Sequence, residues 1–208
     1  LVSLVGKLPI PIEKISIRDI MLAYYEPREF ILLAEAYNEK GKDNPELLKK
    51  SEEYLRRALV LSPKRQGIYY ILAFALAGQG RFEEAVGVAR EAVALSPEVA
   101  KAHYNLGLEL ALAGQKHWDE AERELGVALD ISFVNNRFIG EDRKNISIIY
   151  KKMLGVYIPK KDKERVLRIV KRLKQVDPSL GEDMDIIADL VQKDQWDILM
   201  TALSPEGN

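Results

Sequence analysis

The chain has 208 residues, of which 47% are hydrophobic and 30% charged, a balance typical of a globular protein rather than a disordered one. Its 31 Lys and Arg nearly balance its 32 Asp and Glu, so no overall charge attracts nucleic acid. The absence of cysteine excludes disulfides, thiolate metal sites and a cysteine nucleophile. No stretch stays apolar over the ~18 residues that a membrane-spanning helix needs.

Residues 1–14 are expected to form an extended apolar arm, because Pro9 and Pro11 break any helix and favour extended backbone. The side chains expected to mediate self-association through this arm are Leu1, Val2, Leu4, Val5, Leu8, Ile10 and Ile12. Residues 15–26 then carry apolar side chains at helical spacing and end before Pro27, which predicts an N-terminal capping helix.

From residue 27 onward the chain repeats itself at a spacing of 34 residues. Equivalent residues are Pro63 and Pro97, Tyr69 and His103, Leu72 and Leu106, Ala73 and Gly107, and Gly80 and Gly114. The prolines follow the expected second helix of each unit and stop it. A single helix pair cannot bury its apolar stripe, so neighbouring pairs must stack. The spacing therefore predicts a stack of helix–turn–helix units.

This pattern resembles the tetratricopeptide repeat (TPR), a 34-residue helix–turn–helix family. The resemblance implies an all-α superhelical solenoid of antiparallel helix pairs with N- and C-terminal capping helices. It covers residues 27–203, with repeats at about 27–64, 66–100, 100–135 and 147–180 and a partial repeat at 181–203. Small residues such as Ala73 and Gly107 allow the two helices of a pair to approach closely.

In such superhelices the first helix of each repeat lines a concave groove, which is the usual binding face for peptides. The residues that the resemblance places in this groove are Arg28, Ile31, Asn38, Tyr70, Phe74, Lys101, Tyr104, Leu108 and Lys151. Two interpretations of its apolar middle, Tyr70, Phe74, Tyr104 and Leu108, stay open. A tight superhelix buries these side chains on itself, or they bind an extended apolar peptide, of which the arm is one candidate in its own or a neighbour's groove.

No motif for catalysis, for a cofactor or for a metal is present, so we expect a protein that is not an enzyme and holds neither. His103 occupies a position where the family has a large aromatic residue and is expected in the core. The acids Glu182, Asp183 and Asp185 lie at the expected start of a helix, where they stabilise the helix dipole. Asn145-Ile146-Ser147 fits a glycan acceptor, but Ser147 also fits a helix cap.

Charge is unevenly distributed near the C-terminal end. The segment 143–174 carries 12 Lys and Arg and two acids, whereas the segment 177–197 carries seven acids and one Lys. Such a pair of surfaces is able to join successive subunits. The simpler alternative is a solvated charged helix face.

A further resemblance, carried by Arg18-Asp19, Pro27-Arg28-Glu29-Phe30 and Leu61-Ser62-Pro63-Lys64-Arg65, is to the soluble TPR tails of bacterial O-antigen ligase or polymerase proteins. It implies a bacterial cell-envelope context.

Three functions are compatible with these sequence features. The first is a non-catalytic scaffold that binds a protein or peptide partner in its groove, with no nucleic acid and no membrane span. The second is a structural subunit that assembles head to tail into filaments through the arm, and the third is an accessory domain of an envelope polysaccharide enzyme.

Overall fold

The computed structural model describes residues 27–41, 44–135 and 140–203, and the arm and the capping helix expected at 15–26 lie outside these ranges. The described residues form helices and turns without a strand, which confirms the all-α prediction. The helices are α3 (Pro27–Lys40), α4 (Pro45–Leu61), α5 (Gln66–Gly78), α6 (Phe82–Leu95), α7 (Ala100–Ala113), α8 (Trp118–Asn135), α9 (Gly140–Tyr157), α10 (Lys163–Val176), α11 (Gly181–Gln192) and α12 (Trp196–Ala202). Single 3₁₀ turns at Gln115–His117 and Pro178–Leu180 precede α8 and α11.

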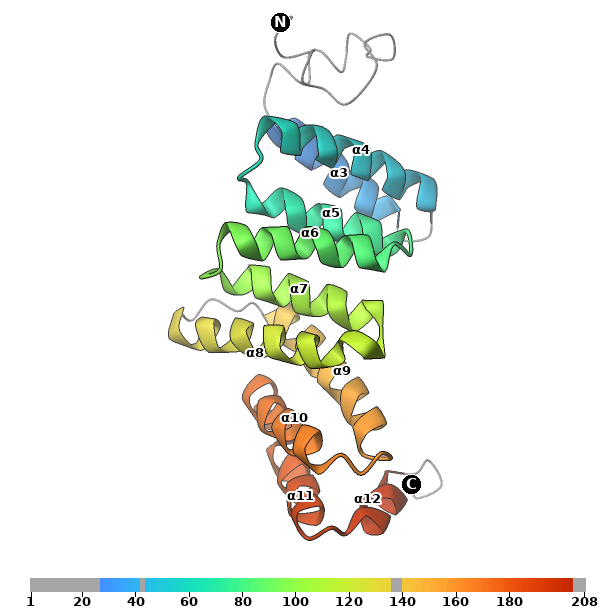
Figure 1. The fold of residues 1–208 in the computed structure, drawn as a ribbon, viewed down its shortest axis with the longest axis vertical. Helices are drawn as coiled ribbons and strands as arrows, with labels where there is room; N and C mark the ends of the chain where they lie inside the picture. The colour runs from blue at the N-terminus through green and yellow to red at the C-terminus, as the bar shows by residue number, and fades with distance from the viewer. Residues whose placement is uncertain (1–26, 42–43, 136–139, 204–208) are drawn as a thin grey trace, which may run out of the picture.

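The helices pack mainly against their neighbours in the chain, so the molecule is an elongated stack of helix pairs (Figure 1). The first helices of successive pairs, α3, α5, α7 and α9, contact one another in order. The second helices, α4, α6 and α8, contact one another less. We call the side formed by α3, α5, α7, α9 and α11 the first-helix face, and the side formed by α4, α6, α8 and α10 the second-helix face.

The 34-residue spacing of the sequence recurs in the contacts of two helix pairs. The Tyr69 hydroxyl donates to the Pro63 carbonyl oxygen at 2.7 Å, and 34 residues later His103 Nε2 lies 2.8 Å from the Pro97 carbonyl oxygen. In both units a side chain near the start of a helix is thereby tied to the proline that follows the preceding helix. Gly80 and Gly114, with φ of 77° and 113°, follow α5 and α7 at equivalent turns where other residues are strained.

The distance between the two helices of a pair depends on the size of one residue at their contact. At Gly107 a Cβ atom would lie 2.7 Å from Leu125 Cγ and 3.2 Å from the Leu125 backbone nitrogen, so α7 and α8 pack as closely as glycine permits. In the expected alignment of the fourth repeat, Leu154 stands at this position. It is buried, and α9 and α10 contact each other less than α7 and α8 do.

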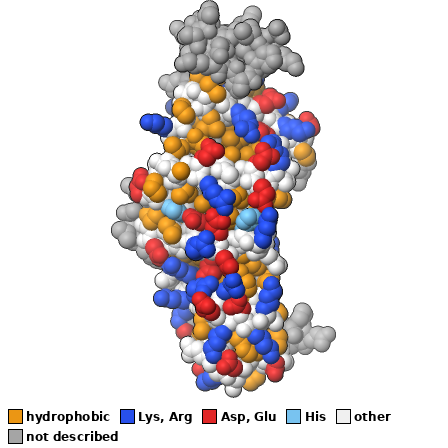
Figure 2. Space-filling model, viewed as in Figure 1, with side chains coloured by type: hydrophobic (Ala, Val, Ile, Leu, Met, Phe, Trp, Pro, Cys, Tyr) orange, Lys and Arg blue, Asp and Glu red, His pale blue; other side chains and the backbone are white. Residues whose placement is uncertain are grey.

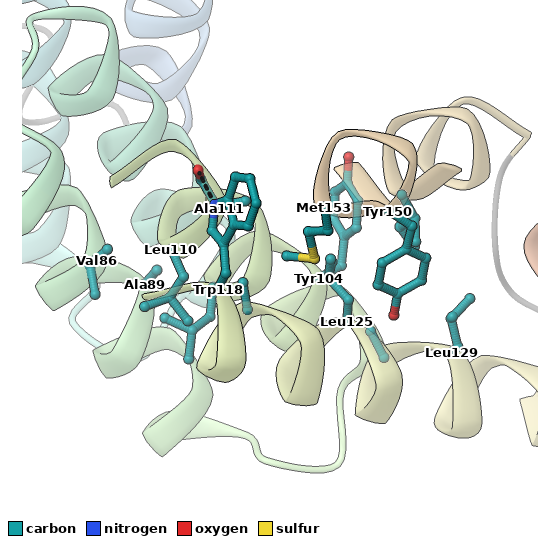
Figure 3. Packing of buried hydrophobic residues seen from close by; sticks show 14 of the residues in the cluster. Val86, Ala89, Tyr104, Leu110, Ala111, Trp118, Leu125, Leu129, Tyr150 and Met153 are labelled. Carbon is teal, nitrogen blue, oxygen red and sulfur yellow. Dashed lines mark hydrogen bonds between the residues drawn. The ribbon is translucent and has the colours of Figure 1, made fainter. Parts of the chain in front are cut away.

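The stack is less regular between α8 and α9. Helix α9 begins at Gly140, so the start of the fourth repeat at 147 was placed too late, and Ser147 is a buried residue inside the helix rather than a cap. The α8 and α9 backbones contact each other far less than those of α6 and α7. Large side chains occupy the junction: Tyr104 of α7, Trp118, Leu125 and Leu129 of α8, and Tyr150 and Met153 of α9 (Figure 3).

Three arginines of α10 reach across the second-helix face to carboxylates of α8. Arg165 binds Asp119 through two hydrogen bonds of 2.7 Å. Arg168 binds Glu122 at 2.9 and 3.3 Å, and Arg172 binds Asp130 at 2.6 and 3.1 Å. The interspersed basic and acidic side chains of this face are visible in Figure 2. Three of the 12 basic residues of the segment 143–174 are thus paired within the chain.

Candidate functional site

An apolar pocket of about 600 Å³ lies between α9, α11 and α12. The first helices α9 and α11 contact each other less than the three preceding first-helix pairs do, and the space left between them is this pocket. Its lining consists of Lys151, Leu154, Gly155, Ile158, Pro159, Met184, Ile187, Met200 and Leu203. A pocket of this size and polarity is typical of a site that binds a small ligand or a few side chains.

One face of α9 forms a wall of the pocket. Lys151 and Gly155 follow one another at helical spacing, and Ile148, 63% exposed, precedes them on the same face; Ile158 lines the pocket directly after the helix ends. A Cβ atom at Gly155 would meet no atom within 4 Å, so the helix surface there is open. The opposite walls include Met184 and Met200, whose flexible side chains adapt to different shapes.

Lys151 is the charged residue of the pocket lining. Its ammonium lies 3.9 Å from an Asp177 carboxylate oxygen, and half of its side chain is exposed. Neighbouring lysines lie closer to their acidic partners: Lys161 lies 3.5 Å from Asp197, and Lys163 lies 3.1 Å from Asp194. Lys151 is therefore able to exchange its weak partner for an incoming carboxylate, and the structure places this predicted groove residue in the pocket.

Two predicted groove residues of α3 are not open to a partner. Ile31 belongs to the core, and Asn38 is buried and donates from Nδ2 to the Ile71 carbonyl oxygen at 3.3 Å. Asn38 therefore packs toward the next pair of helices, and neither side chain is exposed as the groove prediction requires. Arg28, at the start of the same helix, is exposed.

Tyr104, also predicted in the groove, is only 3% exposed because α9 covers it. Its hydroxyl accepts a hydrogen bond from Asn145 Nδ2 at 3.0 Å, and the Lys101 ammonium lies 4.5 Å from the centre of its ring. Lys101 is itself bound to Asp142 of α9 at 2.9 and 3.1 Å. Of the two interpretations of the apolar middle, burial on the protein's own fold therefore holds for Tyr104. The Asn145 amide proposed as a glycan acceptor is used inside the fold.

The remaining predicted aromatic residues lie on α5. Phe74 is 45% exposed, whereas Tyr70 and, on α7, Leu108 are half-buried. The apolar stripe is thus partly covered by its own fold and partly open at Phe74. Burial also raises the pKa of the Tyr70 hydroxyl, whose oxygen is buried without a hydrogen-bond partner.

A buried carboxylate in α7 was not singled out from the sequence. Glu109 is 2% exposed, and its Oε2 has no hydrogen-bond partner. Removal from water raises the pKa of this carboxyl to about 7. The 34-residue spacing carried a signal for it, since the equivalent residue in α5 is Ala75, which is wholly buried.

His103 and the acids at the start of α11 have structural roles. His103 is buried, with Nδ1 2.6 Å from Glu124 Oε2. Glu182 and Asp183 lie in the first turn of α11, and Asp185 pairs with Lys174. Across the described ranges, no cluster of three acidic or histidine side chains suits a metal ion, and no helix has the length and apolar character to cross a membrane. The arm residues Leu1–Ile12 lie outside these ranges.

Comparison with known proteins adds no identity: no protein-family model matches the chain, and no curated protein is detectably similar to it. Function is therefore inferred from the residues and contacts of this chain.

Proposed function

We propose that the chain is a non-catalytic TPR-type scaffold that binds a peptide segment of a partner protein on its first-helix face. The observation that carries this proposal is the apolar pocket of about 600 Å³ between α9, α11 and α12, with Lys151 in its lining. A pocket with apolar walls and one placed charge combines affinity from burial with a means of orienting the bound segment.

The TPR assignment is supported by the two proline contacts made 34 residues apart and by the paired glycines that follow α5 and α7. It is also supported by helix pairs that pack as neighbours and by first helices that lie closer together than second helices. Stacks of this kind present an extended surface along their inner helices, and that surface is where they bind partners.

Exposed apolar side chains favour a peptide over a polar ligand. Isolated exposed apolar residues are ordinary on protein surfaces, but Ile148 of α9 and Phe74 of α5 both belong to first helices, as does most of the pocket wall. A bound segment that covers several such residues gains about 25 cal/mol for each Å² of apolar surface buried.

The test is a selection of peptides from a random library displayed on phage, using the full chain as bait. Affinities of the selected peptides are then measured by calorimetry for the wild type and for Phe74→Glu and Ile148→Glu. Val127→Glu, at an exposed apolar residue of α8 on the second-helix face, is the matched control. We expect a first-helix variant to lose binding and the control to keep it. Failure to select any peptide, or equal losses in all three variants, would refute the proposal.

A further inference from the structure

We infer that the pocket between α9, α11 and α12 binds an acidic amphipathic helix, whose apolar side chains enter the pocket while a carboxylate pairs with Lys151. This inference rests on the proposed scaffold function and adds the chemistry and the place of the bound segment. Three features of the described residues lead to it: the length of the α9 face, the open surface at Gly155 and the sign of the charge.

The α9 face offers apolar contacts separated by a helical length. Ile148, 63% exposed, and the open position at Gly155 lie seven residues apart, which corresponds to about 10 Å along a helix. A helix laid against this face meets Ile148 and the pocket at Gly155 within about two turns of its own. An apolar stripe at helical spacing on the partner therefore matches the wall, as in other complexes where a helix enters a groove.

Gly155 provides the depth of the site. It lies between Lys151 and Ile158 in the wall, and a Cβ atom there would meet nothing within 4 Å. A leucine or phenylalanine side chain of the partner therefore reaches the α9 backbone and contacts Met184 and Ile187 across the pocket. A large side chain at residue 155 would extend into the same space from a Cβ atom that itself meets no neighbour.

The charged residue of the lining favours an acidic partner. Lys151 is the charged residue of the lining, and the lining contains no carboxylate. A carboxylate that displaces Asp177 from its 3.9 Å contact gains a closer pair, while a lysine at the same place is repelled. A partner helix that carries a stripe of leucines flanked by glutamates is thus complementary to the apolar pocket and to Lys151 beside it.

The experiment uses a fluorescein-labelled, acetylated and amidated peptide made of two copies of Glu-Leu-Ala-Glu-Leu-Leu-Glu, and the same peptide with lysine in place of every glutamate. Binding to the full chain is followed by fluorescence anisotropy. We expect the acidic peptide to bind at least about tenfold more tightly than the basic one. Equal affinities would overturn the inference.

Two pairs of variants place the site. Gly155→Trp should weaken the acidic peptide at least about tenfold, whereas Gly87→Trp, at an exposed glycine of α6 with equally open space, should not change it. Lys151→Glu should weaken the acidic peptide and strengthen the basic one, and Lys152→Glu, on the same helix outside the lining, should do neither. Circular dichroism and urea unfolding check that each variant is folded. Equal effects within either pair would contradict the assignment.

Failure of the inference is distinguishable from failure of the scaffold. If peptides selected from the library bind but Gly155→Trp leaves their affinity unchanged, the scaffold stands and this site is wrong. If no peptide binds, both fall. If light scattering shows that the wild type self-associates and that Gly155→Trp is monomeric, the pocket is an interface between copies of the chain, which also overturns the inference.

Discussion

Replacement of Glu109 by glutamine should make the protein more stable, and the gain should grow with pH. The folded carboxyl has a pKa of about 7, against an ordinary value of 4.5, because it is buried without a partner. The folded state thus holds its proton more tightly than the unfolded state, so folding stability falls as pH rises from 4.5 to 7. With 1.36 kcal/mol for each pKa unit, the full effect is about 3 kcal/mol. Between pH 5 and pH 8 most of it, about 2–3 kcal/mol, is realised.

The assay is urea unfolding followed by circular dichroism at pH 5 and pH 8, for the wild type, for Glu109→Gln and for Glu91→Gln at an exposed site on α6. The difference between Glu109→Gln and the wild type isolates this carboxyl, because all other titrating groups are shared. We expect that difference to increase by about 2–3 kcal/mol from the lower to the higher pH, and Glu91→Gln to show no such increase. A pH-independent difference for Glu109→Gln would show that the carboxyl is not held in the protonated form by burial.

Three further outcomes follow from the packing. Gly107→Ala should lower the melting temperature, at a cost of about 1–3 kcal/mol from overpacking against α8. Gly87→Ala, in open space on α6, should instead raise the melting temperature, with a gain of up to about 1 kcal/mol in the free energy of unfolding. Shifts of the melting temperature in the same direction for both variants would contradict the packing argument. Tyr69→Phe should cost about 0.5–1.5 kcal/mol in chemical unfolding, through loss of the hydrogen bond to the preceding turn, and no loss would mean that water replaces this bond. Arg168→Gln combined with Glu122→Gln in a double-mutant cycle should give a coupling of about 0.2–1 kcal/mol that shrinks in high salt, and a salt-independent coupling would exclude an exposed ion pair.

The sequence predicted the helical class because its signals are local. Prolines that stop helices, glycines at tight turns and apolar side chains at helical spacing all act within a few residues of themselves, and the helices end where these signals stand. The position of Tyr69 relative to Pro63 likewise follows from the repeat, since a contact over six residues depends on one turn.

Features that depend on how neighbouring helices lie over one another were not predictable in the same way. Helical periodicity places Ile31 and Asn38 on a face, but it does not say that this face packs toward the next pair. Similarly, nothing local to Arg168 shows that its partner lies 46 residues earlier. Of the predicted groove residues, Lys151 lines the pocket. The pocket itself arises from the separation of α9 and α11, which depends on how these helices lie over one another.

The loose junction between α8 and α9 has a consequence for how the chain opens. In a stack where each unit touches only its neighbours, the free energy that couples two blocks is the energy of the one interface between them. Here that interface consists of large side chains, such as Trp118 edge-on to Tyr157 at 5.9 Å, of long arginines and of the contacts of α7 with α9, with little backbone contact between α8 and α9. We therefore expect hydrogen exchange to divide the molecule into two cooperative blocks, α3–α8 and α9–α12. The pocket lies within the second block, so a ligand bound there protects α9–α12 while leaving exchange in α3–α8 unchanged.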